Sequence, residues 1–174
     1  EIHCKGKEVS IHWFGGEPLY NKPIITLICQ QLKDAGIKYT TKMISNGYLI
    51  DNETIKEAKD LWHLEKVQIT IDGTEEIYNR SKAYIYKDVN AFRRVIGNIH
   101  KLQDAGILVS IRLNIDMHNA ENLSELADEL HREFNDSKGI SVYIHALFEE
   151  VKGSKAIHDE EKRKFVFDQI NDIE

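Results

Sequence analysis

The sequence contains only two cysteines and no long apolar run, and these shortages exclude several classes of protein. Cys4 and Cys29 are too few and too far apart for a disulfide framework or a cysteine-rich metal site, and reduced thiols fit the cytoplasm. No apolar run approaches the roughly 20 residues that span a bilayer, and the N-terminus lacks the pattern of a signal peptide. We therefore expect a cytoplasmic protein.

An excess of positive charge is also missing. The formal net charge is -6, and the basic residues are interleaved with acidic ones. Proteins that bind nucleic acid or anionic membranes carry clustered basic residues, so neither is expected as a direct partner. None of the eight histidines has a metal-binding spacing such as H-E-x-x-H, and no metal site is predicted.

The sequence lacks a starting methionine and a stop signal for its last helix. It begins at Glu1 and ends at Glu174 inside a helical pattern, with no glycine or proline to end it. The length of 174 residues predicts one domain with enough apolar content for a core. We expect residues 1–174 to form a single domain that is a fragment of a longer protein.

A strand-then-helix pattern recurs along the whole chain. The apolar periodicity predicts strands at 8–14, 38–45, 67–72, 108–115 and 140–147. It predicts helices at 22–35, 52–63, 88–105, 119–134 and 158–172. Asp51 or Asn52 can cap the second helix and Asn119 the fourth, while Gly36 and Gly106 end two others. Short loops from helix to strand favour an α/β fold with a parallel sheet.

Alternation within the strands points to a partial, TIM-like barrel. One face is apolar, for example Val67, Ile69 and Ile71, and the other carries polar groups such as Gln68, Thr70 and Asp72. Both faces of a doubly wound sheet are apolar, and the interior of a closed barrel is filled with branched residues. A curved sheet around a polar lumen fits this pattern. An antiparallel sheet with one solvent face is the alternative, and it requires that the helices be discarded.

A glycine pair follows the first predicted strand. Gly15 and Gly16 have no side chains where the backbone must bend, and Pro23 indicates the start of a helix after them. Ligands bind at such positions in α/β folds, although a tight turn alone would explain the pair equally well. Three further strands end in turn-forming or polar segments, at Ser45-Asn46-Gly47, Asp72-Gly73 and Asn114-Ile115-Asp116. One such end per strand predicts a ligand site along the carboxyl edge of the sheet.

Four segments resemble the radical S-adenosylmethionine (SAM) superfamily, in particular its peptide-maturase and sulfatase-maturase-like branch. They are FGGEPL at Phe14 to Leu19, ISNGYLI at Ile44 to Ile50, VQITIDGTEEIYNR at Val67 to Arg80 and SIRLNID at Ser110 to Asp116. The resemblance extends from about Val9 to Leu147. It implies a core of six strand-helix units, a (β/α)6 partial barrel, of which five are present here and the first strand is missing.

The resemblance also implies roles for individual residues in binding SAM. Gly15, Gly16 and Glu17 match the segment whose backbone and carboxylate receive the methionine ammonium, a group that needs acceptors and close backbone approach. Ser45 and Asn46 match a strand end near the cofactor. Further positions include Thr70, where the family commonly has a serine, and Asp72 at the end of the same strand.

The methionine carboxylate needs a cation. Family members often place a basic residue after the Asp-Gly turn, so Arg80 and Lys82 are both candidates. Arg112, Asn114 and Asp116 match a later strand and would face cofactor or substrate. The lumen would also contain His12 and His145, as ligands of substrate or as ordinary structural residues.

The signature of the family, C-x-x-x-C-x-x-C, is absent. Its three cysteines hold a 4Fe-4S cluster whose fourth iron chelates SAM. Cys4 is too close to the glycine pair to belong to it, so the cluster ligands would lie outside this fragment, which we expect to be inactive by itself. The parent would cleave SAM reductively to a radical that abstracts hydrogen, from a peptide or protein substrate, with a reductant such as flavodoxin or ferredoxin.

Two other functions fit parts of the pattern. The chain could be a cluster-free peptide-binding module on the same fold, and three cysteines in the parent protein would argue against that. It could also be a barrel enzyme for a phosphorylated substrate, which predicts a glycine-rich turn after the late strands. Residues 147–154 offer only Gly153 there, so this alternative ranks last.

Overall fold

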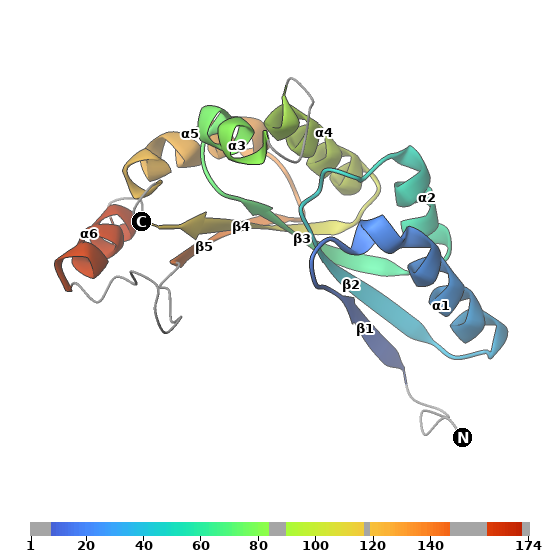
Figure 1. Ribbon diagram of the computed structural model, residues 1–174. Coiled ribbons are helices and arrows are strands. Elements are labelled where there is room, and N and C mark those ends of the chain that lie inside the picture. Colours follow the sequence, from blue (N-terminus) through green and yellow to red (C-terminus); the bar gives the residue numbers. More distant parts are fainter. Residues whose placement is uncertain (1–7, 84–89, 117–118, 147–159, 172–174) are drawn as a thin grey trace. The chain divides into compact units, whose positions relative to one another are not determined.

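The computed structural model describes residues 8–83, 90–116, 119–146 and 160–171. Each strand is followed along the chain by one or two α-helices (Figure 1). The strands are β1 Val9–Trp13, β2 Tyr39–Ser45, β3 Leu64–Ile71, β4 Leu108–Ile115 and β5 Ile140–Ala146. The helices are α1 Lys22–Asp34, α2 Asn52–Asp60, α3 Glu75–Lys82, α4 Ala91–Asp104, α5 Leu123–Phe134 and α6 Glu160–Asn171, with short 3-10 helices η1 Pro18–Asn21 and η2 Ala120–Asn122.

The five strands form one parallel sheet in the order β1-β2-β3-β4-β5. The α/β prediction is confirmed, and the antiparallel alternative is wrong. Within the described residues β1 pairs only with β2, with Val9 opposite Tyr39 and Trp13 opposite Met43. Within the described residues β1 is therefore an edge strand.

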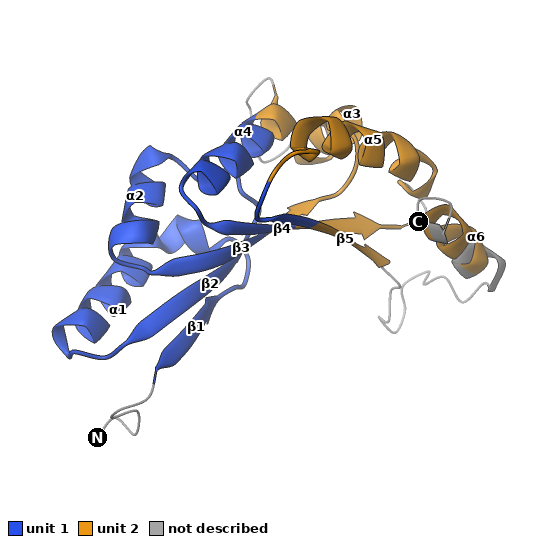
Figure 2. Cartoon of the chain, turned by 180° about the vertical axis from the view of Figure 1, so that it is seen from behind, with its two compact units in different colours: residues 1–69, 94–110, 138–141 blue, residues 70–93, 111–137, 142–174 orange. Residues whose placement is uncertain are grey.

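The chain divides into two compact units (Figure 2). Unit 1 consists of residues 1–69, 94–110 and 138–141, and unit 2 of residues 70–93, 111–137 and 142–174. In unit 1, α1 and α2 lie on one face of β1, β2 and β3 (Figures 1 and 2). The apolar residues Val67 and Ile69 are buried on that face, while Gln68 on the other face is half-buried. A single folding domain stays a prediction.

Two helix ends confirm the role predicted for Gly36 and Gly106. Both have positive φ angles, +67° and +78°. In each case the following isoleucine donates to a carbonyl five residues back, Ile37 to Leu32 and Ile107 to Leu102, both at 3.0 Å. This hydrogen bond ends the helix and leads directly into the next strand.

Helix α3 was not predicted, because only Ile77 and Tyr78 give it an apolar face and the segment is otherwise polar. Charged residues add to the packing of the fully buried Tyr78. Glu75 and Glu76 lie in the first turn and Arg80 and Lys82 in the last, which suits the helix dipole. Strand β5 has no fully buried residue, and Val142 on it is 47% exposed.

Candidate functional site

The glycine turn after β1 has the geometry of a ligand-binding loop. Gly15 has φ +104° and Gly16 φ +36°, which L side chains rarely adopt. A Cβ added to either residue would meet no atom within 4 Å. The turn therefore needs glycine for its backbone, and it leaves both residues open to close approach.

Glu17 connects this turn to the end of β2. One carboxylate oxygen accepts from the Leu19 N–H at 3.0 Å and from the Ser45 hydroxyl at 2.9 Å. The other accepts from the Asn46 N–H at 2.7 Å and also lies 3.1 Å from the Ser45 hydroxyl, which is a single donor shared by the two oxygens. A carboxylate has about four acceptor positions, so three donors leave room for one more. The structure thus brings together five predicted site residues in unit 1, namely Gly15, Gly16, Glu17, Ser45 and Asn46.

The loop after β2 is held by two residues of α4 that the sequence reasoning missed. Asn98 donates to the Gly47 carbonyl at 2.9 Å, and Arg94 donates to the Tyr48 carbonyl at 3.1 Å. The Arg94 guanidinium also lies 4.1 Å from the Tyr48 ring centre. Asn98 could have been found from the sequence, because it is a polar residue at a core position of an amphipathic helix. In the structure it is 2% exposed.

A second group of predicted residues meets in unit 2. Asp72 forms an ion pair with Lys82 at 3.0 Å and accepts from the Asn114 side chain, also at 3.0 Å. Arg112 donates through Nε to Asn114 at 2.9 Å. Among the described residues the two terminal nitrogens of Arg112 have no partner. They remain available for an anion.

Asn119 does not cap a helix as predicted. The described α5 begins at Leu123, and the Asn119 side chain makes no capping bond to η2. Its amide nitrogen donates to the carbonyls of Asp72 and Asn114, both at 2.9 Å, and its oxygen accepts from the Asp116 N–H at 2.8 Å. Satisfying these three backbone groups takes the place of capping, and it fixes the ends of β3 and β4 in unit 2.

Two further predicted residues are Thr70 and Arg80. Thr70 is half-buried on β3, on the polar side of the strand. Arg80 is exposed on α3 and lines a separate hollow of about 780 Å³ with residues such as Glu76 and Arg132. Lys82 rather than Arg80 thus pairs with Asp72.

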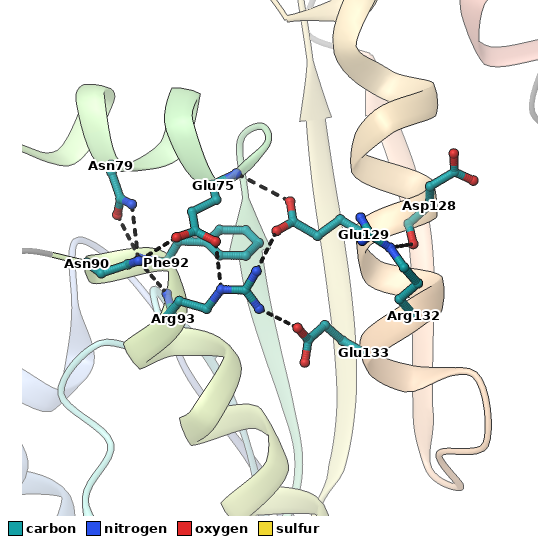
Figure 3. A network of polar contacts seen from close by, with 9 residues as sticks. All are labelled: Glu75, Asn79, Asn90, Phe92, Arg93, Asp128, Glu129, Arg132 and Glu133. Carbon is teal, nitrogen blue, oxygen red and sulfur yellow. Dashed lines mark hydrogen bonds and ion pairs between the residues drawn. The ribbon is translucent and has the colours of Figure 1, made fainter.

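Arg93 forms a charge cluster with three glutamates in unit 2 (Figure 3). Its guanidinium contacts Glu75 at 2.6 Å, Glu129 at 3.1 Å, and Glu133. Hydrogen bonds from Asn90 and then Arg93 lower the pKa of Glu75 below its usual 4.5. Because the cluster joins α3, α4 and α5, it explains how the weakly apolar α3 is held.

We expect Arg93→Met to lower the free energy of unfolding by about 2 kcal/mol at pH 7, since three carboxylates lose their common partner. The folded pKa of Glu75 is lowered, so its contribution is present above pH 4.5 and lost as the pH falls through the folded value. The difference between wild type and variant should therefore shrink between pH 7 and about pH 3. Urea unfolding at several pH values measures it.

The matched control for Arg93→Met is Arg132→Met. Arg132 is exposed on α5, and within the described residues its Nε donates to the Asp128 carbonyl of the same helix, at 3.2 Å. This control should change stability by less than about 0.5 kcal/mol. Equal losses in the two variants would show that the cluster does not stabilise unit 2.

The described residues contain no group of three histidine, cysteine, aspartate or glutamate side chains arranged to hold a metal ion. Cys29 is fully buried, and burial raises the pKa of its thiol to about 11, so it is a core residue rather than a thiolate ligand. His12 and His145, which were predicted to face a lumen, are both exposed. Cys4 and residues 84–86 and 147–154 lie outside the described residues.

The sequence model of the Radical SAM superfamily matches residues 1–132. The chain belongs to this superfamily. Its curated relatives include Fe-coproporphyrin III synthase of Methanosarcina barkeri, which is 27% identical over 146 residues, covering 84% of this chain and 34% of the relative. Membership of the superfamily implies an enzyme family that uses SAM and a 4Fe-4S cluster.

Solved structures show the same fold in this superfamily. The enzyme anSMEcpe with bound AdoMet and Kp18Cys peptide has a TM-score of 0.67 and 18% identity, covering 95% of this chain and 46% of that one. A domain of the pyruvate-formate lyase-activating enzyme from Bacteroides vulgatus has a TM-score of 0.60 and 18% identity, and the match covers 95% of this chain and 94% of that one. SuiB from Streptococcus suis has a TM-score of 0.56 and 17% identity, and the match covers 95% of this chain and 36% of that one.

These comparisons confirm the fold prediction, because the five parallel strands match part of the radical SAM partial barrel. The chain spans less than half the length of the curated relative and of the anSMEcpe structure. In the part of the chain that the structure describes, no helix is long and apolar enough to cross a membrane.

Proposed function

We propose that the parent protein cleaves SAM reductively and uses the product to modify a peptide or protein. The observation that carries this proposal is the open glycine turn, with Gly15 and Gly16 in positive-φ conformations and space in front of both. Bound SAM would supply a 5′-deoxyadenosyl radical that abstracts hydrogen from substrate. The residues of this chain would bind, orient and shield the reactants.

In this proposal the glycine turn and Glu17 bind the methionine ammonium. The backbone at Gly15 and Gly16 can be approached closely, and the Glu17 carboxylate keeps one acceptor position after its three hydrogen bonds. Ser45 and Asn46 hold Glu17 in place. Their role is therefore to position the carboxylate as well as to border the cofactor.

For the methionine carboxylate, Arg112 is a better candidate than Arg80 or Lys82. Lys82 already neutralises Asp72, and Arg80 lines the separate hollow on α3. Arg112 keeps two terminal nitrogens for an anion, and its Nε is fixed by Asn114. Thr70 would offer its hydroxyl to the cofactor. Asp72 and Asn114 would act by holding Lys82 and Arg112.

The cluster itself does not fit the residues of this chain. Three thiolates are needed, whereas the sequence has two cysteines, one of them fully buried. We propose that the cluster ligands belong to another part of the parent protein, which agrees with the 46% coverage of anSMEcpe. A flavodoxin or ferredoxin as reductant and a cytoplasmic location complete the proposal.

Two observations bear on the substrate. Two of the anSMEcpe structures hold a bound peptide, and this supports a peptide or protein substrate. The curated relative is named for Fe-coproporphyrin III, and its 27% identity favours a tetrapyrrole as the second candidate. A cluster-free peptide-binding module remains the alternative of a different class.

The test is SAM cleavage by the parent protein, purified without oxygen and with its cluster reconstituted. With dithionite as reductant we expect 5′-deoxyadenosine and methionine in about equal amounts, measured by chromatography. The control is the same protein with its cluster cysteines replaced by alanine, which should give neither product. A parent protein that lacks the three cysteines, or that binds a peptide without cleaving SAM, would instead support the binding module.

A further inference from the structure

Three basic side chains lie in one row across the uncovered face of unit 1. The strand register places His12 opposite Lys42, and Lys42 opposite Lys66. Neighbouring strands are about 4.8 Å apart, so the row extends across β1, β2 and β3 over roughly 10 Å. The face opposite to it carries the helices α1 and α2 (Figures 1 and 2).

A second row lies beside the basic one, toward the carboxyl ends of the strands. It contains Phe14, Ile44 and Gln68, with Ile44 opposite Gln68. Phe14 is 75% exposed and Ile44 45% exposed, unusually high fractions for large apolar side chains. The two rows line a hollow of about 340 Å³. One side of the hollow is thus basic and the other largely apolar.

The charges of the basic row are not neutralised within the described part of the chain. Lys42 and Lys66 form no ion pair or hydrogen bond with any described residue, and the residues that line the hollow include no carboxylate. Lys22, in contrast, pairs with Glu53 and Glu57 at 3.1 and 3.2 Å. Like charges directly opposite on neighbouring strands destabilise a sheet, and a bound anion would remove this repulsion.

We propose that this hollow binds an organic carboxylate, with the acid group on His12, Lys42 and Lys66 and its apolar body on Phe14 and Ile44. The apolar row favours an amphipathic acid over inorganic phosphate, which has no apolar part to cover these side chains. Acidic residues of a peptide and a porphyrin with propionate groups share this chemistry. The inference rests on the proposed function only in taking the bound acid to be the substrate.

Binding to the full chain tests the proposal without SAM, cluster or reductant, so a failure of SAM cleavage would not affect it. The probes are coproporphyrin III, followed by its fluorescence, and the tripeptide acetyl-Glu-Phe-Glu-amide, followed by calorimetry. We expect at least one acid to bind, with a tenfold or greater loss of affinity in the Lys42→Gln/Lys66→Gln variant. Whichever probe binds identifies the source of the carboxylate.

The matched control is Lys56→Gln/Lys59→Gln, which removes the same charge from exposed positions on α2 of the same unit. It should leave binding unchanged, and Phe14→Ala should weaken binding at an equal net charge. Acetyl-Gln-Phe-Gln-amide should not bind. The proposal is overturned if neither acid binds, if the two double variants lose affinity equally, or if only inorganic phosphate binds. Thermal unfolding of every variant confirms that the sheet is intact.

Discussion

Replacing Gly16 with valine in the reconstituted parent protein should lower its affinity for SAM at least 100-fold and abolish cleavage. The reason is space. Gly16 is exposed and a Cβ at this position points where no protein atom lies within 4 Å, so a branched side chain would fill the room that the proposed ligand needs. Equilibrium binding of SAM and the yield of 5′-deoxyadenosine measure the two effects.

A control variant distinguishes the effect of backbone strain from the loss of SAM binding. Gly36→Val provides the control, because Gly36 also has a positive φ, +67°, and open space around an added Cβ, but it ends α1. Both variants should lose about 1 to 2 kcal/mol of stability, while only Gly16→Val loses SAM. Normal cleavage by Gly16→Val would remove this residue from the cofactor site.

The second large effect concerns Gly47, in the loop after β2. Its φ is +77°, and an added Cβ would lie 3.1 Å from side-chain atoms of both Ile69 and Val95. Alanine there combines a strained backbone with overpacking between a strand and a helix. We expect Gly47→Ala to cost about 3 kcal/mol and lower the Tm by roughly 10 °C, as followed by circular dichroism.

Gly106→Ala isolates the backbone contribution to that loss. Gly106 has φ +78°, almost the same as Gly47, and no atom lies within 4 Å of an added Cβ. This control should lose only about 1 kcal/mol. If both variants lost the same amount, the side chains of Ile69 and Val95 would move aside easily. The loop would then be less tightly packed than the contacts indicate.

The order of strands and helices could be predicted because each depends on the spacing of nearby apolar residues. Val67, Ile69 and Ile71 alternate with polar neighbours, and all three are buried as expected. The Ala-Gly-Ile helix ends were equally local signals, since the glycine and the following isoleucine make the bonds themselves. The fold class follows from these elements.

The candidate site could be predicted only in part. The Gly15-Gly16 turn could be predicted because a glycine pair after a strand indicates a backbone turn, and the polar ends of three further strands then favoured a ligand site over a turn alone. Asn119 was misread, because two of its three hydrogen bonds go to Asp72 and Asn114 rather than into the next helix turn. Helix α3 was missed since its partners, Arg93 and Glu129, come from distant segments. Such contacts leave no local periodicity.

The unpaired side of β1 has a consequence for how the glycine turn that follows it can be studied. Within the described residues no strand pairs with the outer side of β1, so its backbone groups can accept a parallel strand there. Gly15 and Gly16 follow closely after the same strand. A peptide supplied in trans that carries the complementary strand could therefore add to the sheet beside the turn. This edge would make the protein suitable for complementation between two separate chains, each prepared and altered independently.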